Sequence, residues 1–402
     1  MVAPIMRDGG HWLRDPRLKE WATPRQCEFI DAVVRLGSIR KASDELKVNC
    51  SVISESLKSA RDRAATYGYS PAHDMHHTVP DGFKVKGAST YYDKDGLPRG
   101  QWLKSSEDAD RREALFLARV EGLKDDLPKV LPILAPVSCD ADLLTIYPEG
   151  DAHAGLYAWA QETRSAFDLN EYERVNNSAT DALVAAAPAA AEALYIDLGD
   201  STHADDNKNR TPKSGNALDV HGRHAEAIRA NIRVKRYRIR RMLEKHQRVT
   251  VRNNPGNHDP ETALSLAMML EAIYENEPRV TVVTSPNPYW YMGWGSNLIG
   301  TCHGDGAKGK ELPLLMAVDE PQLWAASERG VRLWLVGHVH HKDIKDYPGV
   351  TVEYCRTLAA PDAWSWGAGH RARRTMEAIS LHRDDGEWGR TMVGLRQINR
   401  AA

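Results

Sequence analysis

Cysteine is scarce in this sequence. Five cysteines occur in 402 residues, and no two of them have C-x-x-C spacing. An odd, scattered set argues against a disulfide framework and against a zinc site made of thiolates. We expect these side chains to be small buried apolar groups without a catalytic role. They are Cys27, Cys50, Cys139, Cys302 and Cys355.

Long apolar runs are also missing, and neither sign of charge dominates. No run approaches the roughly 20 residues needed to cross a bilayer. The first 20 residues lack the apolar core of a signal peptide. We therefore expect a cytoplasmic protein that does not enter a membrane. The formal net charge of -2 neither predicts nor excludes a nucleic-acid partner, which would need a local basic patch.

The chain is long enough for two or three domains, and the first is expected at residues 20–68. Residues 22–66 show apolar side chains at helical spacing in three short segments, with Asn49 or Ser51 as the N-cap of the third. This layout resembles the helix-turn-helix of bacterial regulators and phage proteins. The resemblance implies DNA binding, with Ser51, Lys58 and Arg61 as candidate contacts. The alternative is a small bundle used for protein contacts.

Residues 69–128 are expected to link this domain to the rest of the chain. Turn-forming residues are followed by alternating β-formers around "DKDG", which is typical of a β-hairpin. A charged helix is predicted from about residue 105 to residue 125.

The main domain is expected at residues 129–400, where strand, loop and helix patterns alternate. The predicted strands are short apolar runs, several of which end in glycine and ligand-type residues. They are "VLPILAPV", "ADLLTIYP", "ALYIDLGD", "RVTVRNNPGNHD", "NLIGTCHGD" and "VRLWLVGHVHH". Residues 184–193, "VAAAPAAAEA", are predicted to form a packed alanine-rich helix.

Five short motifs follow the predicted strands in a fixed order. They are D-x-H, G-D, G-N-H-D, an isolated histidine in "GTCHGD", and G-H-x-H. This order resembles the calcineurin-like metallophosphoesterase family. The resemblance implies an α/β fold, the four-layer αββα sandwich of that family, and hydrolysis of phosphate esters at two metal ions.

The residue types suit this chemistry without the resemblance. Imidazole and carboxylate ligands bind first-row divalent cations, and the lack of thiolates argues against a closed structural zinc site. Two cations about 3.5–4 Å apart can hold the oxygens of a phosphoryl group and generate hydroxide near neutral pH. Mn²⁺, Fe²⁺ and Zn²⁺ are all compatible with such ligands, and we favour Mn²⁺.

The resemblance also assigns roles to individual residues. One metal ion is expected to be held by Asp151, His153 and His340, the other by Asn257, His303 and His338, with Asp200 bridging the two. With metal-bound hydroxide as the nucleophile, His258 is left to protonate the leaving oxygen as the general acid. Asp259 is expected to hydrogen-bond the His258 imidazole and fix its tautomer.

The G-D motif departs from the pattern of phosphoserine and phosphothreonine protein phosphatases. It continues as "GDSTHADDNK" and not as G-D-x-V-D-R-G. Residues 202–222 are expected to be an insertion near the metals, in which His203, Asp205, Asp206 and Lys208 are solvated or shape substrate entry. The pattern is most similar to phage-encoded metallophosphoesterases with an N-terminal helix-turn-helix, which would act in the cytoplasm of a bacterial host.

Two stretches are candidate substrate contacts. Residues 224–248 predict a helix with one apolar face and one basic face, which could follow a phosphate backbone or simply be solvated. Residues 356–374 mix arginines with tryptophans, which suits stacking on bases, although the tryptophans could instead complete the core. The candidates are Arg233, Arg236, Arg240, Arg356, Trp364, Trp366 and His370.

Three functions are compatible with these features. The first is a metal-dependent phosphodiesterase or nuclease that acts on DNA or RNA. The second is a phosphatase or phosphodiesterase for a small nucleotide, including a cyclic one. The third is a DNA-binding regulator whose phosphoesterase domain is a sensor or scaffold, which the complete set of ligand-type residues disfavours.

Overall fold

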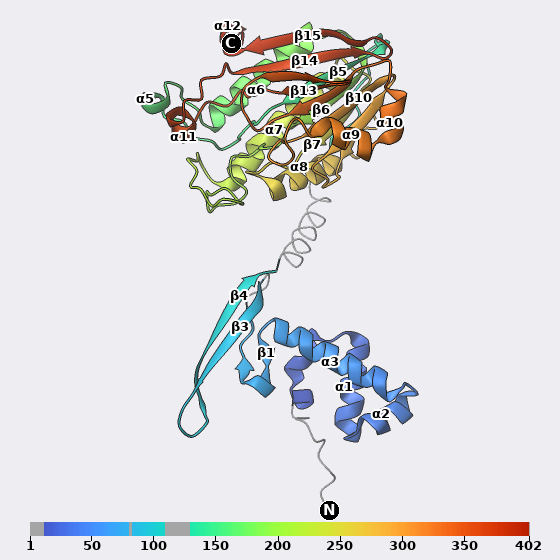
Figure 1. The fold of residues 1–402 in the computed structure, drawn as a ribbon, viewed down its shortest axis with the longest axis vertical. Coiled ribbons are helices and arrows are strands. Elements are labelled where there is room, and N and C mark those ends of the chain that lie inside the picture. Colours follow the sequence, from blue (N-terminus) through green and yellow to red (C-terminus); the bar gives the residue numbers. More distant parts are fainter. Residues whose placement is uncertain (1–11, 80–82, 109–128, 402) are drawn as a thin grey trace, which may run out of the picture. The chain divides into compact units, whose positions relative to one another are not determined.

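The computed structural model describes residues 12–79, 83–108 and 129–401. The chain divides into two compact units, Met1–Glu121 and Gly122–Ala402 (Figure 1). Among the described residues, no helix is both long enough and apolar enough to span a membrane.

The first unit contains three packed helices, as the apolar spacing predicts. They are α1 (Pro24–Leu36), α2 (Ile39–Leu46) and α3 (Cys50–Thr66), preceded by the 3-10 turns η1 (Trp12–Arg14) and η2 (Pro16–Trp21). Helix α3 begins where expected, because the Asn49 side chain accepts a hydrogen bond from the Ser51 amide at 3.0 Å. Phe29, Val33, Ile53 and Leu57 are buried in the shared core.

A β-hairpin follows, also as predicted. Short strands β1 (Tyr69–Ser70) and β2 (Met75–His76) flank the turn η3 (Pro71–His73). Strands β3 (Phe83–Tyr92) and β4 (Pro98–Glu107) then pair antiparallel. The predicted helix from residue 105 is wrong at its start, since residues 105–107 belong to β4. The remainder of that prediction falls on residues 109–128, outside the described residues.

The second unit is built on two β-sheets, so the mixed α/β prediction is confirmed. The six-stranded sheet has the order β15-β14-β5-β6-β7-β8, and β5 to β8 are parallel. Its strands are β5 (Asp140–Glu149), β6 (Ala190–Asp197), β7 (Arg248–Asn253), β8 (Val280–Val283), β14 (Thr375–His382) and β15 (Gly386–Gly394).

The five-stranded sheet has the order β12-β13-β11-β10-β9, and β10 is parallel to β11. Its strands are β9 (Trp290–Trp294), β10 (Asn297–Cys302), β11 (Arg332–Val336), β12 (Asp343–Tyr347) and β13 (Val350–Tyr354). The period of two along each strand sends alternate side chains to opposite faces. Leu144 and Ile146 of β5 therefore join Leu333 and Leu335 of β11 in one apolar cluster between the sheets.

Helices cover the outer faces of the two sheets (Figure 1). A second apolar cluster packs α6 (Leu169–Ala186), α7 (His224–Leu243), α8 (Pro260–Ile273) and α12 (Leu395–Ala401) on the six-stranded sheet. A third packs α9 (Leu312–Asp319) and α10 (Pro321–Ala326) on the five-stranded sheet. Two short helices, α5 (Ala160–Thr163) and α11 (Ala363–Gly367), complete the unit.

Two of the predicted elements are wrong. The run "VLPILAPV" at 130–137 forms no strand, and Leu134 and Val137 are exposed. Its two prolines remove amide donors that a ladder needs. The alanine-rich helix at 184–193 is also wrong, because α6 ends at Ala186 and β6 begins at Ala190, with Pro188 between them.

The basic face predicted for α7 is interrupted by two buried cations. Lys235 Nζ lies 2.5 Å from Asp197 Oδ2, and an Arg238 guanidinium nitrogen lies 2.5 Å from Glu149 Oε2. All four side chains are buried, so Lys235 is not available to a phosphate backbone. Glu149 and Asp197 are the last residues of β5 and β6. The two ion pairs therefore anchor the strand ends that lead into the D-x-H and G-D motifs.

We expect Lys235→Met to destabilise the second unit, because it leaves the buried Asp197 carboxylate without its cation. Removing one partner of a buried pair typically costs about 3–5 kcal/mol. The free energy of unfolding from urea denaturation measures the effect. Arg229→Met, at an exposed position of the same helix, is the control, and equal stability of the two variants would contradict the role of the pair.

Candidate metal centre

Each motif lies immediately beyond a strand end. Asp151 and His153 follow β5, Asp200 follows β6, and Asn257 and His258 follow β7. His303 follows β10, and the pair His338 and His340 follows β11. Because parallel strands end at the same edge of a sheet, and the two sheets face each other, these loops meet.

The meeting side chains form three groups of potential ligands. Two of them contain the predicted ligands, and the third joins His153 to His203 and His258. The nearest ligand atoms of Asp151, His153 and His340 lie within 4.8 Å of one another, as do those of Asp200, His303 and His338. In the first group, His153 Nε2 lies 3.1 Å from His340 Nε2, which lies 3.4 Å from Asp151 Oδ1. Asp151, His153 and His340 thus lie close together, and their assignment to one metal ion stays a prediction.

The second group also includes Asn257. Its Oδ1 atom lies 2.9 Å from His303 Nε2. His303 Nε2 is in turn 3.3 Å from Asp200 Oδ2 and 3.2 Å from His338 Nδ1. All seven predicted ligands are therefore brought together. Their mixed nitrogen and oxygen donors fit a pair of divalent cations.

The backbone is strained where it presents these ligands. Asp151, His153, Asp200, His338 and His340 have φ values of 41°, 47°, 53°, 71° and 58°. This left-handed region is uncommon for residues other than glycine. Such strain persists only where the surrounding structure imposes it, and it concentrates at functional sites. Five of the seven predicted ligands share this feature, which supports a functional reading of the cluster.

Two glycines allow the loops to approach closely. A Cβ on Gly256 would lie 2.1 Å from Asp200 Oδ1, and a Cβ on Gly199 would lie 2.7 Å from His303 Nδ1. Only glycine leaves room at these contacts. This explains why glycine precedes Asn257 in G-N-H-D and Asp200 in G-D.

The cluster shifts the pKa values of its members in opposite directions. Burial, followed by the neighbouring histidines, holds the pKa of His153 well below its ordinary value. Burial also opposes protonation of His303, but the carboxylates of Asp200 and Asp151 outweigh it and raise that pKa to about 10. A crowd of basic nitrogens facing carboxylates binds cations readily, since a cation replaces the protons that the groups otherwise share.

His258 is oriented by a backbone carbonyl and not by Asp259. His258 Nδ1 donates to the His203 carbonyl oxygen at 2.8 Å. This leaves Nε2 facing the cluster, 4.0 Å from Asp200 Oδ2. The expected hydrogen bond from the imidazole to Asp259 is therefore wrong. The Asp259 carboxylate instead accepts from the backbone amides of Asp200 at 3.1 Å and Thr202 at 2.8 Å, which positions the bridging loop.

His203 is a member of the cluster that the sequence analysis placed near the metals but did not count among the residues of the centre. It is buried, contrary to the solvated position expected for the insertion. Its Nδ1 lies 3.2 Å from His153 Nδ1, and its ring stacks on that of His258 at 5.3 Å. Burial lowers its pKa to about 3, so the ring is neutral. Its Nε2 is buried without a hydrogen-bond partner among the described residues. The spacing D-x-x-H from Asp200 was the available signal.

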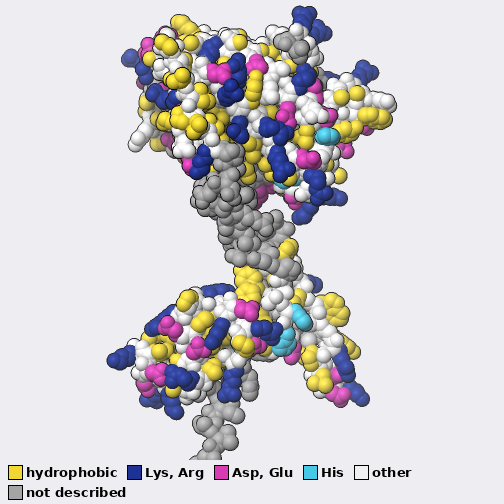
Figure 2. Space-filling view, turned by 180° about the vertical axis from the view of Figure 1, so that it is seen from behind, with side chains coloured by type: hydrophobic (Ala, Val, Ile, Leu, Met, Phe, Trp, Pro, Cys, Tyr) yellow, Lys and Arg dark blue, Asp and Glu magenta, His cyan; other side chains and the backbone are white. Residues whose placement is uncertain are grey.

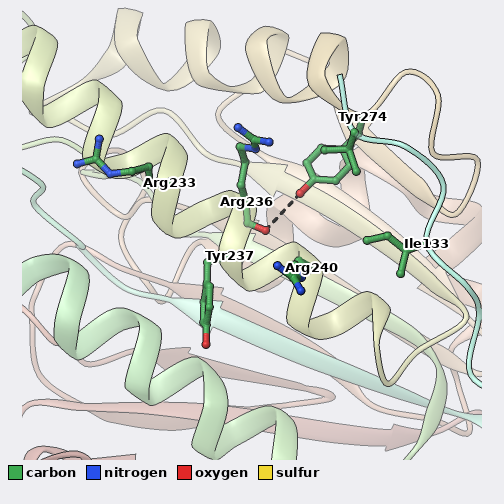
Figure 3. A pocket seen from close by; sticks show the side chains of 7 residues that line it. Ile133, Arg233, Arg236, Tyr237, Arg240 and Tyr274 are labelled. Atoms are coloured by element: carbon green, nitrogen blue, oxygen red, sulfur yellow. Dashed lines mark hydrogen bonds between the residues drawn. The ribbon is translucent and has the colours of Figure 1, made fainter. Parts of the chain in front are cut away.

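The basic candidates on α7 lie apart from the cluster. Figure 3 shows Arg233, Arg236 and Arg240 on one face of α7, together with Tyr274, whose hydroxyl donates to the Arg236 carbonyl at 3.3 Å. They line a cavity of about 320 Å³ that contains none of the predicted metal ligands. Arg233 pairs with Glu173 and Arg240 with Glu244. These arginines therefore lie outside the ligand cluster, and their contact with a phosphate backbone stays a prediction.

The candidates after β13 have different environments. Arg356 is half-buried, and its guanidinium is directed at the Met392 sulfur at 3.9 Å. Trp364 and His370 are exposed, and Trp366 is half-buried. The alternative that these tryptophans complete the core is therefore wrong for Trp364.

Several solved structures are similar to this chain at low identity. One is a Streptococcus pneumoniae protein described as a predicted phosphoesterase, 12% identical with a TM-score of 0.26 over 63% of this chain and 99% of that one. Zinc-complexed Vps29 from Entamoeba histolytica is 12% identical, with a TM-score of 0.24 over 62% of this chain and 98% of that one. A 5′-nucleotidase from Candida albicans is 10% identical, with a TM-score of 0.33 over 67% of this chain and 56% of that one.

No protein-family model and no curated protein sequence matches the chain. The case for an activity therefore depends on the side chains of the cluster itself.

We expect Asp200→Asn to lower the content of bound divalent metal sharply, because Asp200 belongs to the second ligand group and its negative charge also acts on His153 and His340 of the first. Elemental analysis after loading with Mn²⁺ and desalting measures the effect. Asp206→Asn changes an exposed carboxylate of the same loop and should retain the ions. Full metal content in the Asp200 variant would show that the cluster does not depend on this residue.

Proposed function

We propose that the second unit is a calcineurin-like metallophosphoesterase domain, with its layers arranged as the αββα sandwich of that family, and that it hydrolyses phosphodiester bonds in nucleic acid. The observation that carries the proposal is the convergence of seven ligand-type side chains from five strand ends into two adjacent groups. Structural ion pairs do not require so many imidazole nitrogens at one point.

The residues fit two divalent ions, with Mn²⁺ favoured. Asp151, His153 and His340 would hold one ion, while Asn257, His303 and His338 would hold the other. Asp200 would contact both. When bound, two such ions neutralise charge on a phosphoryl group and lower the pKa of nearby water. The Asn257 amide oxygen adds a ligand without adding negative charge.

His258 is assigned the proton transfer to the leaving oxygen. Its Nδ1 is occupied as a donor to the His203 carbonyl, so Nε2 is the atom that gives up the proton. General acid catalysis of this kind contributes about 10²–10⁴-fold. His203 is assigned a neutral contact to the phosphate. If its Nδ1 accepts from His153, its unpartnered Nε2 carries a hydrogen that it can donate to a phosphate oxygen.

We expect His258→Ala to retain bound metal and to lose about 10²–10⁴-fold in kcat, because the imidazole is not needed to hold the ions. Hydrolysis of bis-p-nitrophenyl phosphate with Mn²⁺, together with elemental analysis, measures both quantities. His382→Ala, at the last residue of β14, is the control. Loss of metal from the His258 variant would overturn its assignment as the proton donor.

The substrate class is tested in the same assay. Single-stranded DNA, duplex DNA, RNA, bis-p-nitrophenyl phosphate and p-nitrophenyl phosphate are compared with Asp200→Ala as the inactive reference. Cleavage of diesters and nucleic acid supports the proposal. Cleavage of the monoester alone would replace it with a phosphatase, and failure of the metal-loaded protein to cleave any of them would favour a regulator.

The first unit is proposed to bring the enzyme to DNA as a helix-turn-helix of the phage type, acting in the cytoplasm of a bacterial host. In support, only three residues separate α2 from α3, and Ser51, Lys58 and Arg61 are all exposed on α3. The face drawn in Figure 2 does not show a continuous basic patch that would further support DNA binding. Figure 2 shows basic, acidic and apolar side chains interspersed on the face it presents.

We expect Lys58→Glu to weaken binding to duplex DNA and to reduce the salt dependence of binding, because one phosphate contact is replaced by repulsion. Fluorescence anisotropy at several salt concentrations measures both effects. Lys86→Glu, at an exposed position of β3, makes the same charge change in the same unit. If both variants bind as the unmodified chain does, α3 is not a DNA-contacting helix.

A further inference from the structure

Exposed aromatic side chains lie just beyond the first metal-ligand loop. The segment that carries His153 continues to Tyr157 and Trp159, which are 42% and 51% exposed. The Tyr157 ring stacks with His221 at 6.4 Å and an interplanar angle of 20°. These side chains leave the core at a point where the backbone is fixed, since the Leu156 amide donates to the His153 carbonyl at 3.0 Å.

A second exposed aromatic group lies on α11. Trp364 is 74% exposed and stacks with His370 at a centroid distance of 6.0 Å. The neighbouring Trp366 ring is covered by the Arg371 guanidinium at 3.3 Å, with that of Arg164 at 5.9 Å. Helices α11 and α5 lie side by side, so the segments that carry Trp159 and Trp364 are neighbours (Figure 1).

The second group is also tied to the metal centre. Thr357 Oγ1 donates to the Asp151 carbonyl at 2.6 Å. From Thr357 the chain passes through the buried Ala359 and Ala360 to Asp362, whose side chain caps α11 by accepting from the Ser365 amide at 2.8 Å. Each aromatic group is therefore held at a short, fixed separation along the chain from Asp151 or His153.

Exposed indole rings on segments that also carry guanidinium groups, here Arg164 and Arg371 around the neighbouring Trp366, suit one kind of ligand. Stacking of a base on an aromatic side chain is worth about 1–3 kcal/mol and tolerates any base, since every base has a π-face. Arginines beside the rings favour the phosphates that join such bases. Bases inside a duplex are stacked and paired, so their faces are not accessible to a flat protein surface.

We propose that Tyr157, Trp159 and Trp364 form a platform for unpaired nucleobases beside the metal centre, so that the enzyme prefers single-stranded to duplex nucleic acid. This inference rests on the proposed phosphodiesterase function and names its substrate. Trp366, clamped between arginines, supports α11 and does not itself contact a base.

Binding of a fluorescein-labelled oligothymidylate strand to the full chain in EDTA, where cleavage cannot interfere, tests the platform. We expect Trp364→Ala and Trp159→Ala each to weaken binding about tenfold. Trp388→Ala removes a tryptophan that is 60% exposed on β15, outside the platform, and should bind as the unmodified chain does. Thermal unfolding of each variant verifies that the fold is intact.

Three further nucleic acids identify which feature of the strand the platform binds. An abasic strand of the same length retains the phosphates and lacks the bases, so the unmodified chain should bind it as weakly as Trp364→Ala binds oligothymidylate. A duplex of the same length should compete poorly with the single strand for the metal-loaded chain, with cleavage followed in parallel. Oligouridylate distinguishes RNA from DNA, and equal binding supports stacking without sugar recognition.

Unchanged affinity in both tryptophan variants, or equal affinity for the abasic strand, would overturn the platform and favour an apolar protein partner for these rings. That outcome would leave the phosphodiesterase proposal intact, provided the unmodified chain hydrolyses bis-p-nitrophenyl phosphate. If the unmodified chain hydrolyses no phosphoester, the proposed function fails, whatever the binding results are.

Discussion

The second unit depends on holding several electron-donating side chains closer together than they would otherwise lie. Imidazole nitrogens of His153 and His340 approach to 3.1 Å beside the Asp151 carboxylate. Groups of this kind compete for protons and repel one another when they share the same charge. The left-handed backbone at five of the seven positions adds conformational strain of about 1–3 kcal/mol per residue. The rest of the unit must supply the packing energy that offsets this strain, which bound cations would further relieve.

Packing and ion pairs next to the cluster supply the energy that offsets this strain. The apolar cluster between the two sheets fixes the distance between the strand ends of β5 and β6 on one side and β10 and β11 on the other. Under the six-stranded sheet, the buried pairs of Lys235 with Asp197 and Arg238 with Glu149 hold the last residues of β6 and β5. Asp259 then ties the Asp200 loop to the G-N-H-D loop through backbone amides. The ligands are thus positioned by the apolar cluster, by buried ion pairs and by hydrogen bonds to backbone amides.

The motifs of this cluster can be read from the sequence because their signals are local. Apolar runs end in short polar motifs, and parallel strands deliver such motifs to one edge. The errors arise where long-range packing decides. The burial of Lys235 depends on Asp197, which lies in a different element, and the burial of His203 depends on His153 and His258. Asp259 was predicted to hydrogen-bond the His258 imidazole because the two residues are adjacent in sequence. Its carboxylate instead accepts hydrogen bonds from two backbone amides in the loop after β6. Pro132 and Pro136 are local signals against a strand at residues 130–137. The prediction of a strand there gave more weight to the apolar pattern than to these prolines.

The metal ligands lie at strand ends, whereas the residues proposed to select the substrate lie on exposed segments. The ligand atoms lie at positions that cannot shift without breaking several buried contacts, whereas Tyr157, Trp159 and Trp364 lie on exposed segments that begin within a few residues of Asp151, His153 or Thr357. On the proposed function, a base stacked on those segments would place its neighbouring phosphodiester at a distance set by short, anchored stretches of backbone. Preference among substrates can then be altered by exchanging exposed rings, at little cost in stability, while the metal centre and its supporting ion pairs are unchanged. On the proposed function, the buried network determines which reaction is possible, and the exposed aromatic segments determine which phosphodiester reaches it.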